Sequence, residues 1–147
     1  MKFIVVVIMV FFMALSESNA DLTSNEVEEL STYEMWFHDG KKWVSLDITI
    51  GQFLKYILYL FPADPPHISK GDDGVIIKIL DKELLLTQSV ALISPLDSKP
   101  KVIYTPVSLR SKGGTFDEVG AASFIWQVIY DSEAKMEEHR RAEEQIR

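Results

Sequence analysis

The sequence predicts an α+β protein, in which a β-sheet packs against a central helix and a second helix ends the chain. Three observations indicate this class. Two runs rich in aromatic and β-branched residues flank Asp39-Gly40, a dipeptide typical of a tight β-hairpin. A capping box at Thr49 opens an apolar stripe at helical spacing. Runs of β-branched residues farther along the chain then predict additional strands.

Composition limits the classes of protein that this chain can belong to. The chain has 147 residues, a net charge of −7, 47% hydrophobic residues and no cysteine. This length suits one domain, and the hydrophobic content is sufficient for a core. Because an acidic chain is repelled by phosphate backbones, no nucleic-acid partner is expected. The absence of cysteine excludes disulfides, zinc-finger sites and thiol catalysis.

Residues 1–20 have the form of a secretory signal peptide. Lys2 is followed by an apolar run from Phe3 to Leu15, and small residues lead up to Ala20. The apolar run is shorter than the roughly 20 residues that a membrane-spanning helix needs. We therefore expect cleavage after Ala20, secretion, and no membrane span in the mature chain. An uncleaved signal anchor is the alternative.

Residues 21–32 form an acidic arm, which is expected to be either a short polar helix or disordered. In the hairpin that follows, a two-residue loop at Asp39-Gly40 would place Trp36 opposite Trp43. Strand alternation then sorts the side chains onto two faces. The expected core face carries Tyr33, Met35, Val44, Leu46 and Ile48. The other face is polar apart from the two tryptophans.

Thr49 and Gln52 form the predicted capping box of a helix from Ile50 to Phe61. Its apolar stripe consists of Ile50, Phe53, Leu54, Ile57 and Phe61. Prolines and glycines predict a loop over residues 63–74. Strands are predicted over 75–80, 83–86 and 101–105, with a helical turn or another strand at 87–94. Pro106 is expected to interrupt the last strand.

The order hairpin, helix, proline loop and further strands resembles the ubiquitin-like β-grasp superfamily. Asp64-Pro65-Pro66 stands where ubiquitin has a double proline, and residues 77–84 match one of its strands and the turn after it. Residues 107–114 are similar to its basic diglycine terminus. The resemblance implies a β-grasp domain over residues 33–112 and protein partners. The alternative fold is another small α+β domain with a sheet and a helix, such as a cystatin-like one.

Residues 113–147 are predicted to form a diglycine hinge and a C-terminal helix. Gly113 and Gly114 suit a flexible linker, and a second capping box begins at Thr115. We expect the apolar stripe of this helix to cover the tryptophan side of the sheet. The stripe consists of Phe116, Val119, Ala122, Trp126 and Ile129. The second half is charged, with expected ion pairs Asp131–Lys135, Glu137–Arg141 and Glu143–Arg147.

No pattern of catalytic or metal-ligating residues is present. His38, His67 and His139 are scattered and lack the spacing of a helical metal pair. The sequence also has no nucleophile elbow and no phosphate-binding glycine loop. We therefore expect no enzymatic activity, no metal and no cofactor.

The sequence favours a secreted protein that binds a protein partner of unknown identity. Trp36 and Trp43 are the predicted anchors, with Ile76 and Tyr104 as lesser candidates beside them. One alternative is a secreted ubiquitin mimic that is cut after Gly114. The other is a carrier that holds a small apolar ligand between the sheet and the helix that contains residues 53–61.

Overall fold

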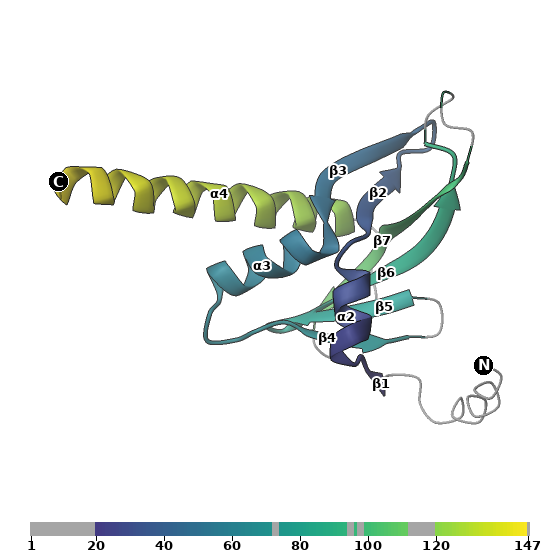
Figure 1. The fold of residues 1–147 in the computed structure, drawn as a ribbon, viewed down its shortest axis with the longest axis horizontal. Coiled ribbons are helices and arrows are strands. Elements are labelled where there is room, and N and C mark those ends of the chain that lie inside the picture. The colour runs from purple at the N-terminus through teal and green to yellow at the C-terminus, as the bar shows by residue number, and fades with distance from the viewer. Residues whose placement is uncertain (1–19, 72–73, 94–95, 97–98, 112–119, 147) are drawn as a thin grey trace.

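The computed structural model describes residues 20–71, 74–93, 96, 99–111 and 120–146. It confirms the α+β class, with one mixed β-sheet and a long C-terminal helix (Figure 1). The predicted signal peptide before Ala20, the Gly113-Gly114 hinge and the capping box at Thr115 lie outside the described residues.

The elements follow one another as β1 (Ala20–Asp21), α2 (Ser24–Leu30), β2 (Glu34–His38), β3 (Trp43–Thr49), α3 (Ile50–Leu60), β4 (His67–Lys70), β5 (Gly74–Ile79), β6 (Lys82–Ala91), β7 (Lys101–Ser111) and α4 (Ala121–Ile146). The sheet has seven strands in the order β1-β4-β5-β6-β7-β2-β3. Neighbouring strands are antiparallel except β2 and β7, which are parallel where Met35 lies opposite Tyr104. The hairpin that comes early in the chain therefore joins the sheet beside the last strand.

The acidic arm folds as the helix α2, which confirms the helical alternative. Thr23 and Glu26 form a capping box, because the Thr23 Oγ1 accepts from the Glu26 backbone N–H and the Thr23 N–H donates to Glu26 Oε1 at 2.9 Å. Leu30, at the end of the helix, is buried in the main core. One apolar anchor and a strong cap therefore hold a helix whose other residues are mostly polar.

The β2–β3 hairpin has a longer loop than predicted. His38 lies opposite Trp43, so four residues from Asp39 to Lys42 form the loop. Asp39 Oδ1 accepts from the backbone N–H groups of Lys41 at 2.8 Å and Lys42 at 2.9 Å. These N–H groups lower the pKa of the Asp39 carboxyl. The Asp39 side chain thus closes the loop together with the Asp39 backbone N–H, which donates to the Lys42 carbonyl oxygen at 3.1 Å.

The side chains of the hairpin stay on their predicted faces, because the register of β2 and β3 differs from the predicted one by two residues. Trp36 lies opposite Ser45 and not opposite Trp43. Met35 and Leu46 are buried in the core, as predicted, whereas Trp36 and Ser45 are only half-buried. A shift by an odd number of residues would have exchanged the two faces.

The predicted central helix is confirmed as α3. Thr49 is its N-cap, and Gln52 completes the capping box. Ile50, Phe53 and Ile57 are fully buried in one cluster with residues of the sheet and of α4. Helix α3 therefore carries the centre of the core.

In the middle of the chain, one prediction is wrong and one open alternative is decided in favour of a strand. Residues 67–70, expected to be loop, form β4, which pairs with β5 from His67 opposite Lys78 to Lys70 opposite Val75. Residues 87–91, left open between helix and strand, continue the ten-residue strand β6. In both segments the pairing with a neighbouring strand decides the structure, because short runs of mixed polarity have weak local preferences.

Pro106 lies within β7 and does not interrupt it. It pairs with Leu86 where the register of β6 and β7 shifts, so the ladder is already irregular where the proline lacks an N–H group. Beyond it, residues 108–111 are paired with β6, and Val107 is the extra residue at the register shift. The resemblance to ubiquitin identified these residues with a free terminus, and here they are strand.

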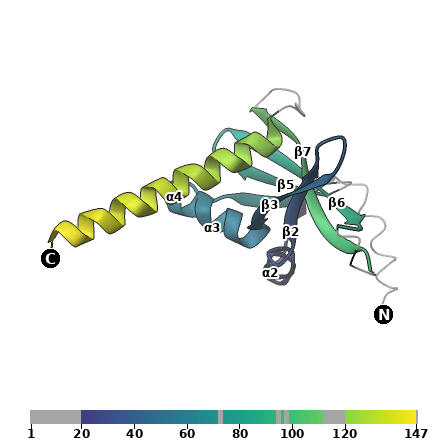
Figure 2. The same cartoon turned by 90° about the horizontal axis from the view of Figure 1, so that it is seen from above.

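The C-terminal helix does not cover the tryptophan side of the sheet, contrary to the prediction. Figure 2 shows α4 beside α3 on one side of the sheet, and the two helices are in contact. The residues of α4 that are buried are Ala121, Ile125, Val128 and Ser132. This stripe lies one position before the predicted one, which leaves Trp126 39% exposed.

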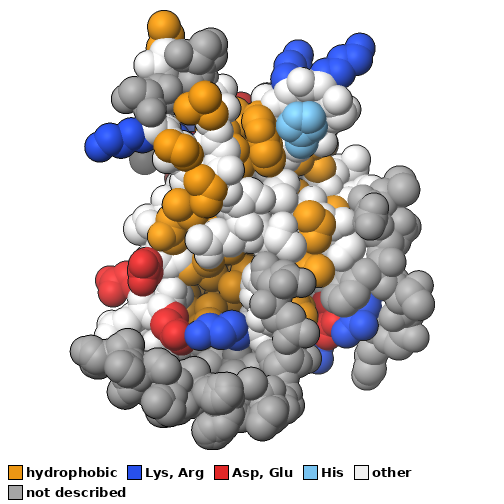
Figure 3. All heavy atoms as spheres, turned by 90° about the vertical axis from the view of Figure 1, so that its right-hand side faces the viewer, with side chains coloured by type: hydrophobic (Ala, Val, Ile, Leu, Met, Phe, Trp, Pro, Cys, Tyr) orange, Lys and Arg blue, Asp and Glu red, His pale blue; other side chains and the backbone are white. Residues whose placement is uncertain are grey.

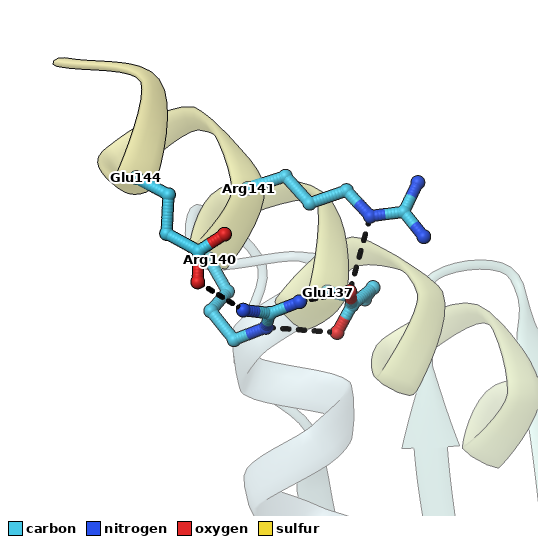
Figure 4. Close-up of polar contacts among 4 residues, drawn as sticks. All are labelled: Glu137, Arg140, Arg141 and Glu144. Atoms are coloured by element: carbon cyan, nitrogen blue, oxygen red, sulfur yellow. Dashed lines mark hydrogen bonds and ion pairs between the residues drawn. The ribbon is translucent and has the colours of Figure 1, made fainter.

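The second half of α4 projects beyond the body of the molecule (Figure 1). Arg140 bridges Glu137 at 2.6 Å and Glu144 at 2.5 Å, and Arg141 bonds Glu137 at 3.1 Å (Figure 4). The predicted pair Glu137–Arg141 is therefore confirmed. Such pairs stabilise an exposed helix segment.

The other two predicted ion pairs have different outcomes. The predicted pair Asp131–Lys135 is wrong. The Lys135 Nζ lies 5.2 Å from the centre of the Tyr59 ring, and Asp131 accepts from Gln127 at 2.9 Å. Arg147, of the pair Glu143–Arg147, lies outside the described residues.

The ion pairs make the projecting part of α4 sensitive to acid. Arg140 above all, and then Arg141, lower the pKa of Glu137 from 4.5 to about 2. A lowered pKa in the folded state stabilises the helix above pH 4.5, and this stabilisation is lost as the pH falls toward 2. We expect Glu137→Gln to reduce helix content at neutral pH, with the difference from the wild type disappearing near pH 2.

Far-ultraviolet circular dichroism as a function of pH measures this effect. Glu138→Gln is the matched control, because Glu138 has no ion pair among the residues described. An equal loss of helix content in both variants at neutral pH would contradict the role of the Glu137 pairs.

Candidate functional site

The tryptophan face, defined by Glu34, Trp36, Trp43 and Ser45, lies on the side of the sheet away from α3 and α4. Strand alternation places it there, because Met35 and Leu46 point into the core on the other side. Trp36 lies opposite Ser45, and Trp43 is two residue pairs farther along the ladder, opposite His38. The tryptophans are therefore diagonal neighbours on one face.

Each tryptophan is held by a polar neighbour. The Trp36 Nε1–H donates to Glu34 Oε1 at 2.9 Å. The ring of Trp43 meets that of His38 edge to face, with 5.2 Å between centroids. Both indoles remain half-buried. These contacts orient large side chains that are still partly accessible, which is the usual condition of an interface anchor.

Two neighbours favour the ionised form of the Glu34 carboxylate that holds Trp36. The hydrogen bond from Trp36 has the largest effect in lowering the pKa of Glu34, and Lys101, whose Nζ lies 3.0 Å from Glu34 Oε1, lowers it further. Lys101 comes from the start of β7, so this ion pair joins the hairpin to the last strand. The orientation of Trp36 thus depends on a contact between segments far apart in the sequence.

A groove of about 380 Å³ lies beside Trp36. It is lined by Glu34, Trp36, Ser45, Asp47, Ile48, Thr49 and Gln52. Asp47 adopts a φ of 56°, and its backbone N–H donates to Ser45 Oγ at 2.9 Å. Aspartate tolerates this left-handed conformation better than most residues. The groove therefore combines an indole with two carboxylates.

The structure does not bring Tyr104 and Ile76 to the tryptophans. Tyr104 is buried on the core side of the sheet, opposite Met35 and 5.4 Å from the ring of Tyr33. Ile76 lies on β5, and β6 and β7 separate this strand from β2, which corresponds to about 14 Å at the usual strand spacing. Their prediction as neighbours of Trp36 is wrong for two reasons. Tyr104 is on the strand next to β2 but faces the core, and two strands separate Ile76 from β2.

Sequence reasoning missed a second exposed apolar surface, on the β6–β7 hairpin. Val90 is 66%, Leu92 56% and Leu96 94% exposed. Figure 3 looks at the end of the molecule that carries this hairpin, and hydrophobic side chains follow it toward the body. The sequence contains a run of apolar residues here. Because residues 87–94 could be either helix or strand, these apolar side chains could not be assigned to a face.

The described residues do not contain a cluster of three or more histidine, aspartate or glutamate residues that could hold a metal ion. His67 pairs with Asp21 at 3.1 Å, and His139 Nδ1 lies 2.7 Å from the Tyr59 hydroxyl, so the two are in unrelated environments. Within the same part of the chain, none of the helices has the length and apolar character needed to cross a membrane.

The side of helix α3 that was expected to line a cavity for a small apolar ligand packs in the core. Phe53 and Ile57, which would line it, are fully buried in the packed core. Comparisons of the chain with protein-family models, curated proteins and solved structures found no match.

Proposed function

We propose that this protein is a secreted, non-enzymatic binding module that holds a protein partner on its tryptophan face. The observation that carries the proposal is the pair of diagonal, half-buried tryptophans on a sheet face that α3 and α4 leave open. Tryptophan is enriched among the residues that dominate binding energy at protein interfaces. The apolar run before Ala20 supports secretion.

We further propose a β-grasp relationship for the domain. In its support, an early hairpin precedes the helix α3, and the last strand, β7, lies parallel to β2. The continuous meander from β4 to β7 is a variation on that plan. A β-grasp relationship would concern the fold alone. The binding proposal depends instead on the surface residues.

The groove beside Trp36 favours a partner segment with a basic side chain. Glu34 is already paired with Lys101, whereas Asp47 is exposed and has no ion pair among the described residues. A lysine or arginine entering the groove would meet this carboxylate and the indole of Trp36 together. The net charge of −7 would assist its approach.

We expect the double substitution Trp36→Ala/Trp43→Ala to abolish capture of the partner. Truncation of anchor residues typically costs about 2 kcal/mol or more, which corresponds to a loss of about thirtyfold in affinity. The measurement is quantitative affinity capture from the fluid into which the protein is secreted, with the wild type and the variant compared side by side.

Trp126→Ala is the matched control, because Trp126 is also a partly exposed tryptophan but lies on α4. A specific partner should be lost with the double variant and kept with the control. Equal recovery of every captured protein by all three forms would refute the proposed surface.

A further inference from the structure

A second and larger groove, of about 600 Å³, lies between α2 and the core side of the sheet. Leu30 and Tyr33 come from the end of α2 and the residues after it, and Val75 and Tyr104 come from β5 and β7. These four side chains belong to the main core or pack against it. The groove is therefore an open extension of the core, and its volume is in the range of small-molecule sites.

An ion pair crosses from one wall of this groove to the other. Lys70 Nζ, at the end of β4, lies 3.1 Å from Glu26 Oε2 on α2. Glu26 also accepts the Thr23 backbone N–H through its other oxygen. Glu26 and Lys70 thus satisfy each other, and neither leaves a free charge for a ligand.

Glu29, one turn after Glu26 on α2, is the remaining charged residue that lines the groove. It has no ion-pair partner among the described residues. The other polar groups at this end of the groove are Tyr104 and Gln88, and the Tyr104 hydroxyl donates to Gln88 Oε1 at 3.2 Å. Glu29 also raises the pKa of Tyr104, after the larger effects of burial and of Tyr33.

Two aromatic rings line the same groove. Tyr33 and Tyr104 meet edge to face with centroids 5.4 Å apart. Tyrosine rings attract cations through their faces, and apolar walls exclude water around a bound ligand. An uncompensated carboxylate, two aromatic rings and apolar walls together complement an ammonium group attached to an apolar body.

We propose that the groove between α2 and the sheet binds a small organic ammonium ion, with the ammonium at Glu29 and the apolar body against Leu30 and Val75. This site is separate from the tryptophan face, because its lining belongs to the core side of the sheet. The function that follows is the binding of a protonated amine in addition to a protein partner.

The test uses three probes that share one body and differ in charge: phenethylammonium, the neutral 2-phenylethanol and the anionic 3-phenylpropanoate. Binding to the purified protein is followed by the amide NMR shifts of Gly74 and Gln88, both of which line the groove. We expect saturable shifts with phenethylammonium and an affinity at least about fivefold above that for the alcohol. The anion should bind most weakly.

Glu29→Gln removes the charge and keeps the shape, so it should bring the affinity for phenethylammonium close to that for the alcohol. Glu28→Gln is the matched control, since Glu28 is on the same helix, is exposed and does not line the groove. The Trp36→Ala/Trp43→Ala variant should bind the ammonium probe normally, which separates this site from the partner surface.

Two results would overturn the proposal. One is equal affinity for the ammonium and the alcohol in the wild type, or no saturable shift with any probe. The other is an equal loss of affinity in Glu29→Gln and Glu28→Gln. That result would mean that the net charge of the protein attracts the ammonium ion, and not Glu29 in the groove. Thermal unfolding of both variants, expected to match the wild type, shows that α2 is intact.

Discussion

Replacement of Phe53 by alanine is expected to lower the free energy of unfolding by about 3–5 kcal/mol. Phe53 has no exposed surface and lies on the face of α3 that contacts the sheet and α4. Truncation removes buried apolar area and leaves a cavity between three elements, which cannot all move to fill it. This loss is a large part of the total stability of a domain of this size.

Urea denaturation followed by tryptophan fluorescence and by circular dichroism measures the effect. Leu58→Ala is the matched control, because Leu58 is on the same helix but is 46% exposed. It should cost less than about 1 kcal/mol. Similar losses in the two variants would mean that α3 does not pack on the sheet through the face described above.

Substitution of Gly74 by alanine is expected to lower the free energy of unfolding by about 2 kcal/mol or more. A Cβ atom at Gly74 would overlap the carbonyl oxygen of Leu86 and would lie 2.9 Å from Thr87 Cα. Both neighbours are backbone of β6, so β5 and β6 would have to separate. Because β5 and β6 are inner strands, the separation would disturb the ladders on both sides.

Gly71→Ala provides the comparison. Its added Cβ would meet only ordinary contacts, the nearest being Ile76 Cδ1 at 3.6 Å. The midpoint of urea denaturation should fall clearly for Gly74→Ala and little for Gly71→Ala. If Gly74→Ala is as stable as the wild type, the close approach of β5 to β6 at this position is wrong.

The elements that could be predicted are those whose signals are local. Helix α3 has a cap at Thr49 and an apolar stripe within a few turns, and both act through neighbours in the sequence. The strand β5 has a dense run of β-branched residues. In contrast, β4 contains His67 and Lys70 and is a strand because β5 provides hydrogen-bond partners.

In the candidate site, too, features with local signals could be predicted, and contacts between distant segments could not. The two faces of the hairpin follow from the two-residue period of a strand, so Trp36 and Trp43 were placed together on the side away from the core. Their neighbours could not be predicted, since the position of Ile76 follows from the order of the strands and that of Tyr104 from the register between β2 and β7. The groove at α2 also joins residues from both ends of the domain.

The sequence by itself determined the α+β class, the helix from Ile50 and the side of the hairpin on which the tryptophans lie, because caps and periodicity act over a few residues. Only the tertiary structure decided the packing side of α4, the extra strand β4 and the groove lined by Glu29. These depend on which apolar surfaces meet. Several strand orders and helix positions are compatible with the same local pattern, and the packing of the core determines which one forms.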